Sequence, residues 1–212
     1  MPDLISKDVR DYVDALVPAR PPELEAMEAY ARAEHFPIIG PACGHLCYQI
    51  ARMIGARRIF ELGSGFGYST AFFAKAVREH GGGDVHHVVW SEGLSARARG
   101  HLDALGYDGI VRYHVGEAVA ELRRADGPFD LIFNDIDKDG YPASLPVIEE
   151  KLRAGGVLVI DNMLWGGRIF DPADSSPDTE GVREFTRLIT TSDRWTTSLV
   201  PLRDGMIVAL KR

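Results

Sequence analysis

Two short polar segments have the residue types and spacing of a metal site. The first, DIDKDG at residues 135–140, places three carboxylates at alternate positions, with a lysine among them and a glycine behind. A calcium-binding EF-hand loop begins in the same way, but its twelfth position must be a bidentate Glu, and this chain has Pro146 there. That loop also follows a helix, whereas Asp135 follows FDLIFN, which is typical of a strand. The sequence therefore excludes an EF-hand.

The second segment is Asp161-Asn162, which follows the apolar run GGVLVI. Asp135 and Asp161 would then end two consecutive parallel strands joined by a helix. Such strands commonly lie side by side, about 5 Å apart, with their carboxyl ends at one edge of the sheet. Two carboxylates and an amide oxygen are typical ligands of a hard cation such as Mg²⁺, Ca²⁺ or Mn²⁺. DIDKDG alone favours a polar turn, but together with Asp161-Asn162 it predicts that Asp135, Asp161 and Asn162 bind a divalent cation.

A lysine three residues beyond Asp135 is the candidate general base. Beside a divalent cation the ammonium form of Lys138 is disfavoured, so its pKa should fall and its amine should be able to accept a proton. Asp135 and Lys138 are therefore the predicted catalytic residues.

The glycine-rich segment FELGSGFGYST, residues 60–70, indicates a ligand-binding turn between a strand and a helix. A dinucleotide fingerprint requires its third glycine at position 68, where this chain has Tyr68. Glu61 is an anion, and it suits a positively charged ligand better than a pyrophosphate. Glu92, predicted to end the second strand, can accept hydrogen bonds from both hydroxyls of a ribose. S-adenosylmethionine, a positively charged nucleoside without phosphates, fits both residues.

The third predicted strand ends in VGEA, residues 115–118, beside Glu92 at the same edge of the sheet. Backbone groups near Glu117 and Ala118 are therefore expected to meet the adenine ring. Two structural alternatives stay open at this point. The glycines at 63–67 are also found in ordinary strand-to-helix turns, and Glu117 is also a favourable residue at a helix N-terminus.

These segments lie in a chain that alternates between strands and helices. We predict strands at 57–62, 85–91, 110–115, 129–134 and 156–160, and helices near 68–80, 95–106, 117–125 and 142–153. The strands are apolar runs, as expected when both faces of a parallel sheet are covered. A helix near 180–191 and two strands joined at Asp204-Gly205, a favoured hairpin pair, follow. The pattern predicts an α/β fold with a mostly parallel, doubly wound sheet that ends in an antiparallel hairpin.

The first 55 residues have a different pattern, with helical spacing in segments 6–17, 21–36 and 41–55. We predict one domain over residues 1–212, with a helical cap at 1–55 and an α/β core at 56–212. The net charge of −7 gives no global attraction to nucleic acid or anionic lipid. We expect neither a signal peptide nor a membrane span, because the sequence has no apolar run of the required kind. Cys43 and Cys47 favour buried thiols in a reducing compartment, so we expect a cytoplasmic protein.

Three segments carry a resemblance to a known family: FELGSGFGYST, DLIFNDIDKDGY at 130–141 and LRAGGVLVIDNMLWGG at 152–167. The chain resembles the cation-dependent O-methyltransferases, which include the catechol and caffeoyl-coenzyme-A O-methyltransferases, over about residues 37–212. The D-x-D-K motif, with its partner D-N 26 residues beyond Asp135, is highly specific. The resemblance implies a Rossmann-like, class I methyltransferase fold with a seven-stranded sheet, and it suggests a homodimer.

The resemblance also implies roles for individual residues. Asp135, Asp161 and Asn162 would hold the metal, Lys138 would be the general base that also contacts the substrate, and Trp165 would wall the substrate pocket. Residues on cofactor-binding positions would be Ile39, Glu61, Gly63, Ser69, Glu92, Glu117, Ala118 and Asp137. Cys43 occupies a position where the family often has Glu, so no role is transferred to it.

The expected activity is methyl transfer from S-adenosylmethionine to a hydroxyl of a catechol-like small molecule, with Mg²⁺ as the favoured cation. One alternative is a tRNA wobble hydroxyuridine O-methyltransferase of the same fold. Such an enzyme needs a basic rim, for which the candidates are Arg52, Arg57, Arg58, Arg97, Arg99, Arg123 and Arg124. A second alternative is a non-enzymatic cofactor-binding protein, against which the intact acids and Lys138 argue.

Overall fold

A seven-stranded, mostly parallel sheet forms the centre of the protein, as the sequence predicts. The computed structural model describes residues 5–212, so residues 1–4 of the predicted cap lie outside the described residues. The strands are β1 (Arg58–Leu62), β2 (Asp84–Val89), β3 (Val111–Val115), β4 (Phe129–Asn134), β5 (Leu152–Ile160), β6 (Trp195–Val200) and β7 (Met206–Lys211). Their order in the sheet is β3-β2-β1-β4-β5-β7-β6. The first five pair in parallel, whereas β7 runs antiparallel to both β5 and β6.

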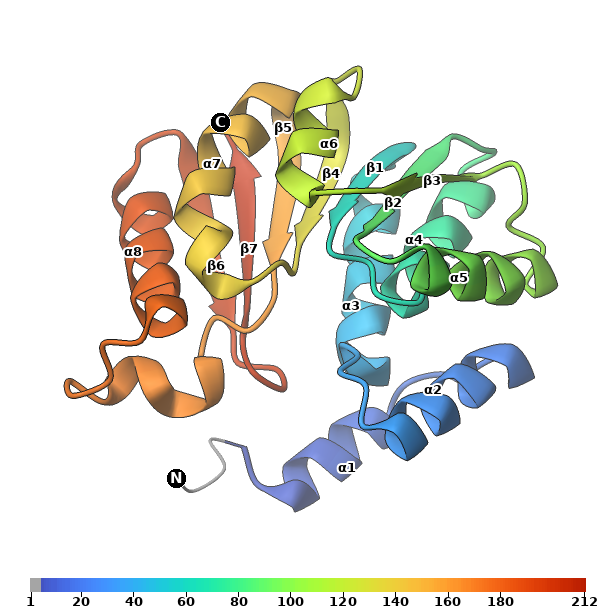
Figure 1. Cartoon of the computed structure of the whole chain (residues 1–212), viewed down its shortest axis with the longest axis horizontal. Helices are drawn as coiled ribbons and strands as arrows, with labels where there is room; N and C mark the ends of the chain where they lie inside the picture. The colour runs from blue at the N-terminus through green and yellow to red at the C-terminus, as the bar shows by residue number, and fades with distance from the viewer. Residues whose placement is uncertain (1–4) are drawn as a thin grey trace.

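Helices cover both faces of this sheet (Figure 1). The α-helices are α1 (Lys7–Ala15), α2 (Pro22–Glu34), α3 (Gly40–Met53), α4 (Tyr68–Glu79), α5 (Glu92–Ala104), α6 (Ala118–Arg124), α7 (Tyr141–Lys151) and α8 (Pro177–Thr191). Two short 3₁₀ helices are η1 (Lys138–Gly140) and η2 (Trp165–Phe170). One apolar core joins α2–α5 to the sheet, and a second joins α6–α8 to its other face. Coverage of both faces explains the apolar strands.

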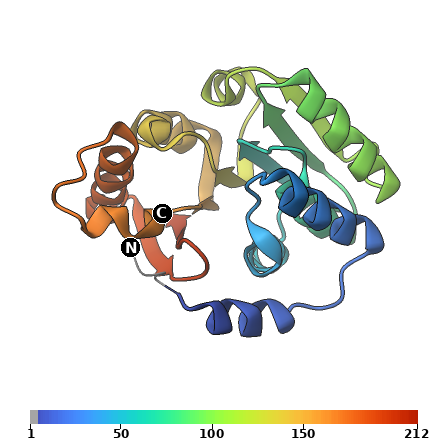
Figure 2. The ribbon, with the colours of Figure 1, turned by 60° about the horizontal axis from the view of Figure 1, so that its bottom comes forward.

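The N-terminal helices α1 and α2 lie across the lower end of the molecule in Figure 1. Viewed from that end, α1 crosses the outside of the molecule, and residues 16–21 lead from it to α2 (Figure 2). Whereas α2 buries Leu24, Met27 and Ala31, α1 has no buried residue. The two helices therefore differ in how firmly they pack on the core.

Two strand boundaries differ from the sequence predictions by more than one residue. β2 ends at Val89 rather than residue 91, because the side chain of Ser91 accepts a hydrogen bond from the backbone N–H of Leu94 (3.3 Å) and caps α5. Glu92 is therefore the first residue of a helix and does not end a strand. β5 begins at Leu152 rather than 156, because its Gly155 adopts a φ of 68° within the strand, where the pairing with β4 shifts register.

Among residues 5–212, no helix is long and apolar enough to cross a bilayer.

Candidate active site

A cavity of about 640 Å³ opens at the carboxyl ends of the parallel strands. In open α/β sheets this edge is where ligands bind, and the volume is in the range of small-molecule sites. The cavity is lined by residues 36–38 before α3, by Gly63 and Gly65 after β1, and by segments 88–90, 116–118, 135–140 and 161–165. Asp178 and Arg203 complete the lining. The ends of the five parallel strands therefore line one space.

The glycine loop brings the end of β1 against the end of β4. Gly63 has a φ of 85°, and a Cβ atom at this position would lie 2.4 Å from the carbonyl oxygen of Asp135. The backbone N–H of Asp135 donates to the carbonyl of Leu62 (2.8 Å). The loop is also held to β2, because the Ser64 N–H donates to the Val88 carbonyl (2.9 Å). Only glycine at position 63 permits this close approach.

Behind this loop lies a buried carboxylate without a hydrogen-bond partner. Glu61 is fully buried, and neither of its oxygens accepts a hydrogen bond from any described residue. Burial raises the pKa of Glu61 to about 7, although the nearby hydroxyls of Ser69, Thr70 and Ser64 oppose the shift. A buried carboxylate behind the glycine loop is stabilised by a positively charged ligand nearby and disfavours a pyrophosphate.

Asp135 and Asp161 lie next to one another at the ends of paired strands. β4 pairs with β5 up to Asn134 and Ile160, so each aspartate is the next residue along its strand. Asp161 is fully buried, and burial together with the charge of Asp135 raises the pKa of Asp161 to about 7. Its Oδ1 has no hydrogen-bond partner in the described part of the chain. The predicted proximity of the two carboxylates is confirmed.

Lys138 is held against Asp135 in the first turn after β4. Its Nζ donates to Oδ1 of Asp135 (2.8 Å) and to the carbonyl of Ile136 (2.9 Å). The Nζ also lies 5.9 Å from the centre of the Trp165 ring. Only 8% of Lys138 is exposed, and yet it lines the cavity. The predicted base therefore faces the space in which a substrate would lie.

The turn between β6 and β7 forms a wall of the site that the sequence did not indicate. Asp204 accepts hydrogen bonds from the Asn162 side-chain amide (3.3 Å) and from the Gly166 N–H (2.6 Å). One residue earlier, the Arg203 guanidinium donates to Oδ2 of Asp161 (3.2 Å). The sequence predicts Asp204-Gly205 only as a hairpin turn, and no pattern within the chain assigns its flanking residues to the site.

Two further positioning contacts were also missed. The buried hydroxyl of Tyr141 donates to the carbonyls of Asp161 (3.0 Å) and Asn134 (3.5 Å), which ties the ends of β4 and β5 together. Gly181 on α8 packs so closely that a Cβ atom there would lie 2.1 Å from the Lys138 carbonyl oxygen. Both residues contact the backbone of the predicted site, and such contacts leave no sequence motif.

The predicted cofactor residues are distributed unevenly around this cavity. Gly63, Glu117, Ala118 and Asp137 line it. Glu61 and Ser69 are buried behind the glycine loop. Ile39 lines a separate cavity of about 180 Å³ under α1. The carboxylate of Glu117 caps α6 by accepting from the N–H groups of Val119 (2.9 Å) and Ala120 (2.6 Å), so only its backbone is available for an adenine.

Glu92 does not lie where the sequence predicts it. It is exposed on the first turn of α5, and within residues 5–212 the cavity lining does not include it. The position at the end of β2 belongs instead to Trp90, which lines the cavity and is 69% exposed. Ser91 moves Glu92 into the helix by capping it. The cavity therefore presents an indole where a carboxylate was expected.

Trp165 lines the opposite part of the cavity, as predicted for a wall of the substrate pocket. Its indole N–H donates to the Thr179 hydroxyl (3.1 Å), and its backbone has a φ of 47°. This bond to α8 fixes the ring in orientation. The role of Trp165 in substrate binding stays a prediction.

The cavity carries an excess of negative charge. Six acidic residues and two basic residues are among those that line it, and the acidic ones are Glu117, Asp135, Asp137, Asp139, Asp161 and Asp178, against Lys138 and Arg203. The described residues contain no cluster of three or more Asp, Glu, His or Cys side chains arranged to hold a metal ion. The predicted metal site has two carboxylates, and its third ligand is the amide of Asn162. The excess charge favours positively charged occupants.

Known proteins resemble this chain over most of its length. The O-methyltransferase family matches residues 24–212. A protein of Mycobacterium marinum named as an O-methyltransferase is 32% identical over 174 residues, which are 82% of this chain and 77% of the relative. A similarly named protein of Mycobacteroides abscessus is 33% identical and covers 82% of this chain and 80% of its own length.

Solved structures share the fold and contain the cofactor or its product. An O-methyltransferase from Bacillus cereus, in complex with SAH, superposes with a TM-score of 0.87 at 27% identity and covers 97% of both chains. The O-methyltransferase TomG from Streptomyces achromogenes, involved in tomaymycin synthesis and bound to SAM, has a TM-score of 0.87 at 27% identity. It covers 100% of this chain and 99% of its own. With its fold, its cofactor-sized cavity and these matches, the chain belongs to the O-methyltransferase family and is a class I, S-adenosylmethionine-dependent O-methyltransferase.

Proposed function

We propose that the protein transfers a methyl group from S-adenosylmethionine to one hydroxyl of a catechol-like molecule held by a divalent cation. The observation that carries this proposal is the pair formed by the partly exposed Asp135 and the buried Asp161, with Lys138 beside Asp135 in the lining of the cavity. The cation would be Mg²⁺ by preference, since the three donors are oxygens.

The residues at the strand ends fit such a cation. Oδ1 of Asp161 is buried without a hydrogen-bond partner among residues 5–212, which leaves this oxygen free to bind a ligand. The side-chain N–H₂ of Asn162 is occupied by Asp204, which orients its amide. Asp135, Asp161 and Asn162 would therefore hold the ion, and two adjacent oxygens of a catechol suit the positions left open on it.

Each residue of the site would have its own role in the methyl transfer. When bound, S-adenosylmethionine supplies the methyl group, and the cation lowers the pKa of the substrate hydroxyl. Lys138 accepts the hydroxyl proton at Nζ, which the carboxylate of Asp135 and the Ile136 carbonyl hold in place. The Trp165 ring limits the positions of an aromatic substrate. Alignment of the oxygen with the methyl group is expected to supply several kcal/mol of the rate enhancement.

The tRNA alternative has less support. Three of the seven arginines proposed for a basic rim are already paired with a carboxylate. The N···O distance is 3.5 Å for Arg52 and 3.6 Å for Arg58, and it is shorter for Arg124. None of the seven is among the described residues that line the cavity. We therefore propose a small-molecule substrate. A homodimer and a cytoplasmic location are also proposals, and the two buried, free cysteines support the second.

Removal of the cation tests the proposal directly. We expect a chelator to abolish methylation of a catechol and added Mg²⁺ to restore it. Asp161→Ala, and the similarly sized Asp161→Asn, should lose activity by roughly 100-fold or more while still binding S-adenosylmethionine. Activity is measured as methylated product, and cofactor binding by calorimetry.

The control is Asp193→Ala, which removes a surface aspartate after α8 and should behave as the unchanged protein. Full activity of the chelated, metal-free protein would contradict the proposed use of a cation. Methylation of bulk tRNA, without turnover of any catechol, would favour the alternative.

A further inference from the structure

Arg203 occupies a position that a simple metal site does not require. Its guanidinium donates to Oδ2 of Asp161 at 3.2 Å, on the carboxylate whose other oxygen has no partner among the described residues. The Arg203 side chain is 37% exposed, whereas that of Asp161 is 1% exposed. A permanent positive charge therefore already contacts one of the predicted metal ligands.

The backbone of Arg203 is strained in order to place this side chain. Its φ is 52°, in the left-handed region that favours glycine. The turn that imposes this angle is fixed on both sides, because the Met163 N–H donates to the Gly205 carbonyl (2.9 Å) and the Leu164 N–H to the Asp204 carbonyl (2.8 Å). Strain of this kind persists only where the surroundings enforce it, and it is concentrated at functional sites.

With Arg203 in place, each of the two aspartates has a basic side chain as its partner. Lys138 pairs with Asp135, and Arg203 pairs with Asp161. A divalent cation bound to Oδ1 of Asp161 would share this carboxylate with the Arg203 guanidinium, which contacts Oδ2. The two positive charges would then be only a few ångströms apart, and they would repel each other.

Arg203 lines more than one cavity. Besides the main cavity, it lines two smaller cavities under α1, of about 180 and 410 Å³. Asp14 at the end of α1 lines both of these, and its carboxylate accepts a hydrogen bond from the Ala42 N–H (3.2 Å). These cavities place a second acid, the exposed Asp14 on α1, beside the same space as Arg203.

We infer that Arg203 competes with the divalent cation for Asp161, and so sets the metal affinity of the site. This inference rests on the proposed function, since it assumes that the strand ends hold a cation. Metal binding moves the guanidinium away from Asp161 toward Asp14, and the repulsion lowers the affinity for the ion. A residue that only positioned Asp161 would have the opposite effect, because its loss would weaken metal binding.

The test is a titration of the purified protein with Mn²⁺, followed by electron paramagnetic resonance of the free ion, with no catalytic assay. Arg203→Gly removes the guanidinium and suits a φ of 52°, so this variant should fold. We expect its dissociation constant for Mn²⁺ to fall by about 10- to 100-fold, because the repulsion between the guanidinium and the ion is removed. Arg203→Lys keeps the positive charge, and it should stay close to the unchanged protein.

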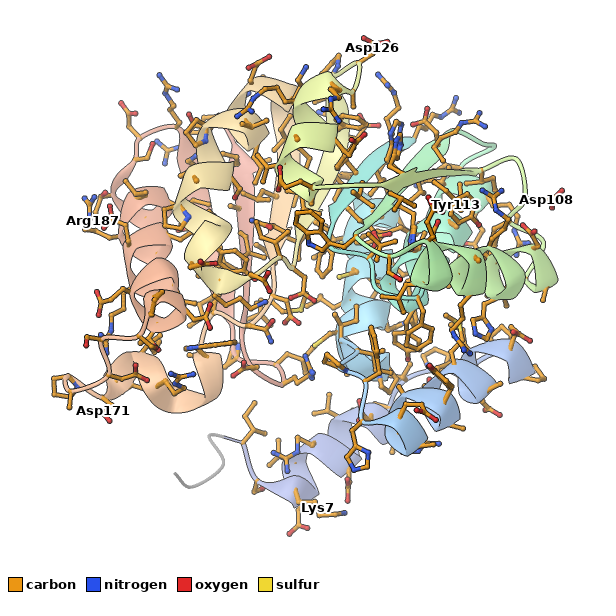
Figure 3. The ribbon with its side chains drawn as sticks, in the orientation of Figure 1. Lys7, Asp108, Tyr113, Asp126, Asp171 and Arg187 are labelled. Atoms are coloured by element: carbon orange, nitrogen blue, oxygen red, sulfur yellow. The ribbon has the colours of Figure 1, made fainter. Side chains whose placement is uncertain are left out.

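The matched control is Arg187→Met, which makes the same change in net charge on α8. Figure 3 shows Arg187 on the outer side of that helix, where it pairs with Glu184. Its Mn²⁺ affinity should equal that of the unchanged protein. Asp14→Asn alone should weaken Mn²⁺ binding. Added to Arg203→Gly, the same substitution should have no effect, because Asp14 acts only through the arginine.

The outcomes separate this inference from the proposed function. Equal or weaker Mn²⁺ binding by Arg203→Gly, with measurable binding by the unchanged protein, overturns the competition and leaves the proposed cation in place. Absence of Mn²⁺ binding in both proteins overturns the use of a cation, and the competition with it. Tighter binding by Arg203→Gly alone supports the inference.

Discussion

Buried carboxylates give individual residues of this site their chemical character. Glu61 and Asp161 are both fully buried, and burial raises the pKa of each to about 7. Their charges are unfavourable in the protein alone and become favourable when a positively charged ligand arrives. At this scale the buried charges lower the stability of the protein alone, and a positively charged ligand such as S-adenosylmethionine would offset this loss.

A pH dependence follows for Glu61. Its pKa rises from 4.5 in the unfolded chain to about 7 in the folded protein, so between these values the folded protein binds more protons at this residue. The contribution of Glu61 to the free energy of unfolding therefore falls as the pH rises through this window, by roughly 3 kcal/mol in total. Affinity for S-adenosylmethionine should rise with pH through about 7, because its positive charge favours the ionised form.

Glu61→Gln checks this prediction, since its amide does not titrate. Unfolding by denaturant and calorimetric binding at several pH values should show both pH dependences in the unchanged protein, with the part due to Glu61 missing in the variant. If stability and affinity changed with pH in the same way in both proteins, Glu61 would be ionised over the whole pH range measured.

The sequence predicted which side chains converge at the site where residue type and strand order together determined it. Asp135, Lys138, Asp161 and Asn162 follow two neighbouring strands, and polar residues that converge at such strand ends commonly bind ligands. Arg203 could not be predicted in this way, because it reaches the site through a turn that carries no motif. Glu92 was misplaced because its neighbour Ser91 caps the helix.

At the scale of elements, close helix packing supports the turn that carries the predicted base, Lys138. Helix α8 contacts η1 through Gly181, where a Cβ atom would lie 2.1 Å from the Lys138 carbonyl oxygen and 2.9 Å from Cα of Asp139. Gly181→Ala should therefore push α8 from η1, cost roughly 1–3 kcal/mol of stability and move Lys138. We expect the turnover number to fall while the affinity for S-adenosylmethionine is kept.

Gly100→Ala is the matched control. Gly100 lies in α5, where an added Cβ atom would have nothing within 4 Å, and its φ is not strained. This change should stabilise the protein by up to about 1 kcal/mol and leave turnover as it is. Thermal unfolding and steady-state kinetics measure both effects. Normal turnover by Gly181→Ala would show that η1 adapts without moving its lysine.

Element positions were predicted better than their ends. All strands and the closing hairpin were predicted, because apolar runs and turn residues mark them. The start of β5 was missed, since Gly155-Gly156 reads as a turn in sequence but forms an irregularity inside the strand. Such irregularities depend on the partner strand, which no local pattern reveals.

At the scale of the whole molecule, α2 holds the glycine loop to the rest of the protein. The buried carboxylate of Glu28 accepts two hydrogen bonds from Arg20 (2.6 and 3.2 Å) and one from the hydroxyl of Tyr68 (2.8 Å), which begins α4. Phe36, just after α2, also lies close to Gly65 of the loop. Helix α2 of the N-terminal cap is therefore in contact with the glycine loop and with the helix that follows it.

Glu28→Ala should break this connection. It leaves the Arg20 charge and the Tyr68 hydroxyl without their partner, so we expect a loss of roughly 2–4 kcal/mol in the free energy of unfolding and weaker binding of S-adenosylmethionine. Glu25→Ala, on the exposed side of the same helix, is the control and should change little. Equal stability of the two variants in urea would mean that α2 is held by its apolar contacts alone.

The position of β7 between β5 and β6 has a consequence for the newly made chain. β7 is the last of the seven strands to be synthesised, yet it covers the side of β5 at Val157–Ile160. Until it arrives, β5 is an open edge of four consecutive apolar residues, of the kind that pairs with other chains and aggregates. A chain that is released before β7 has been made would therefore expose β5 as an unpaired edge strand and be prone to aggregate. That exposed strand ends at Ile160, one residue before Asp161.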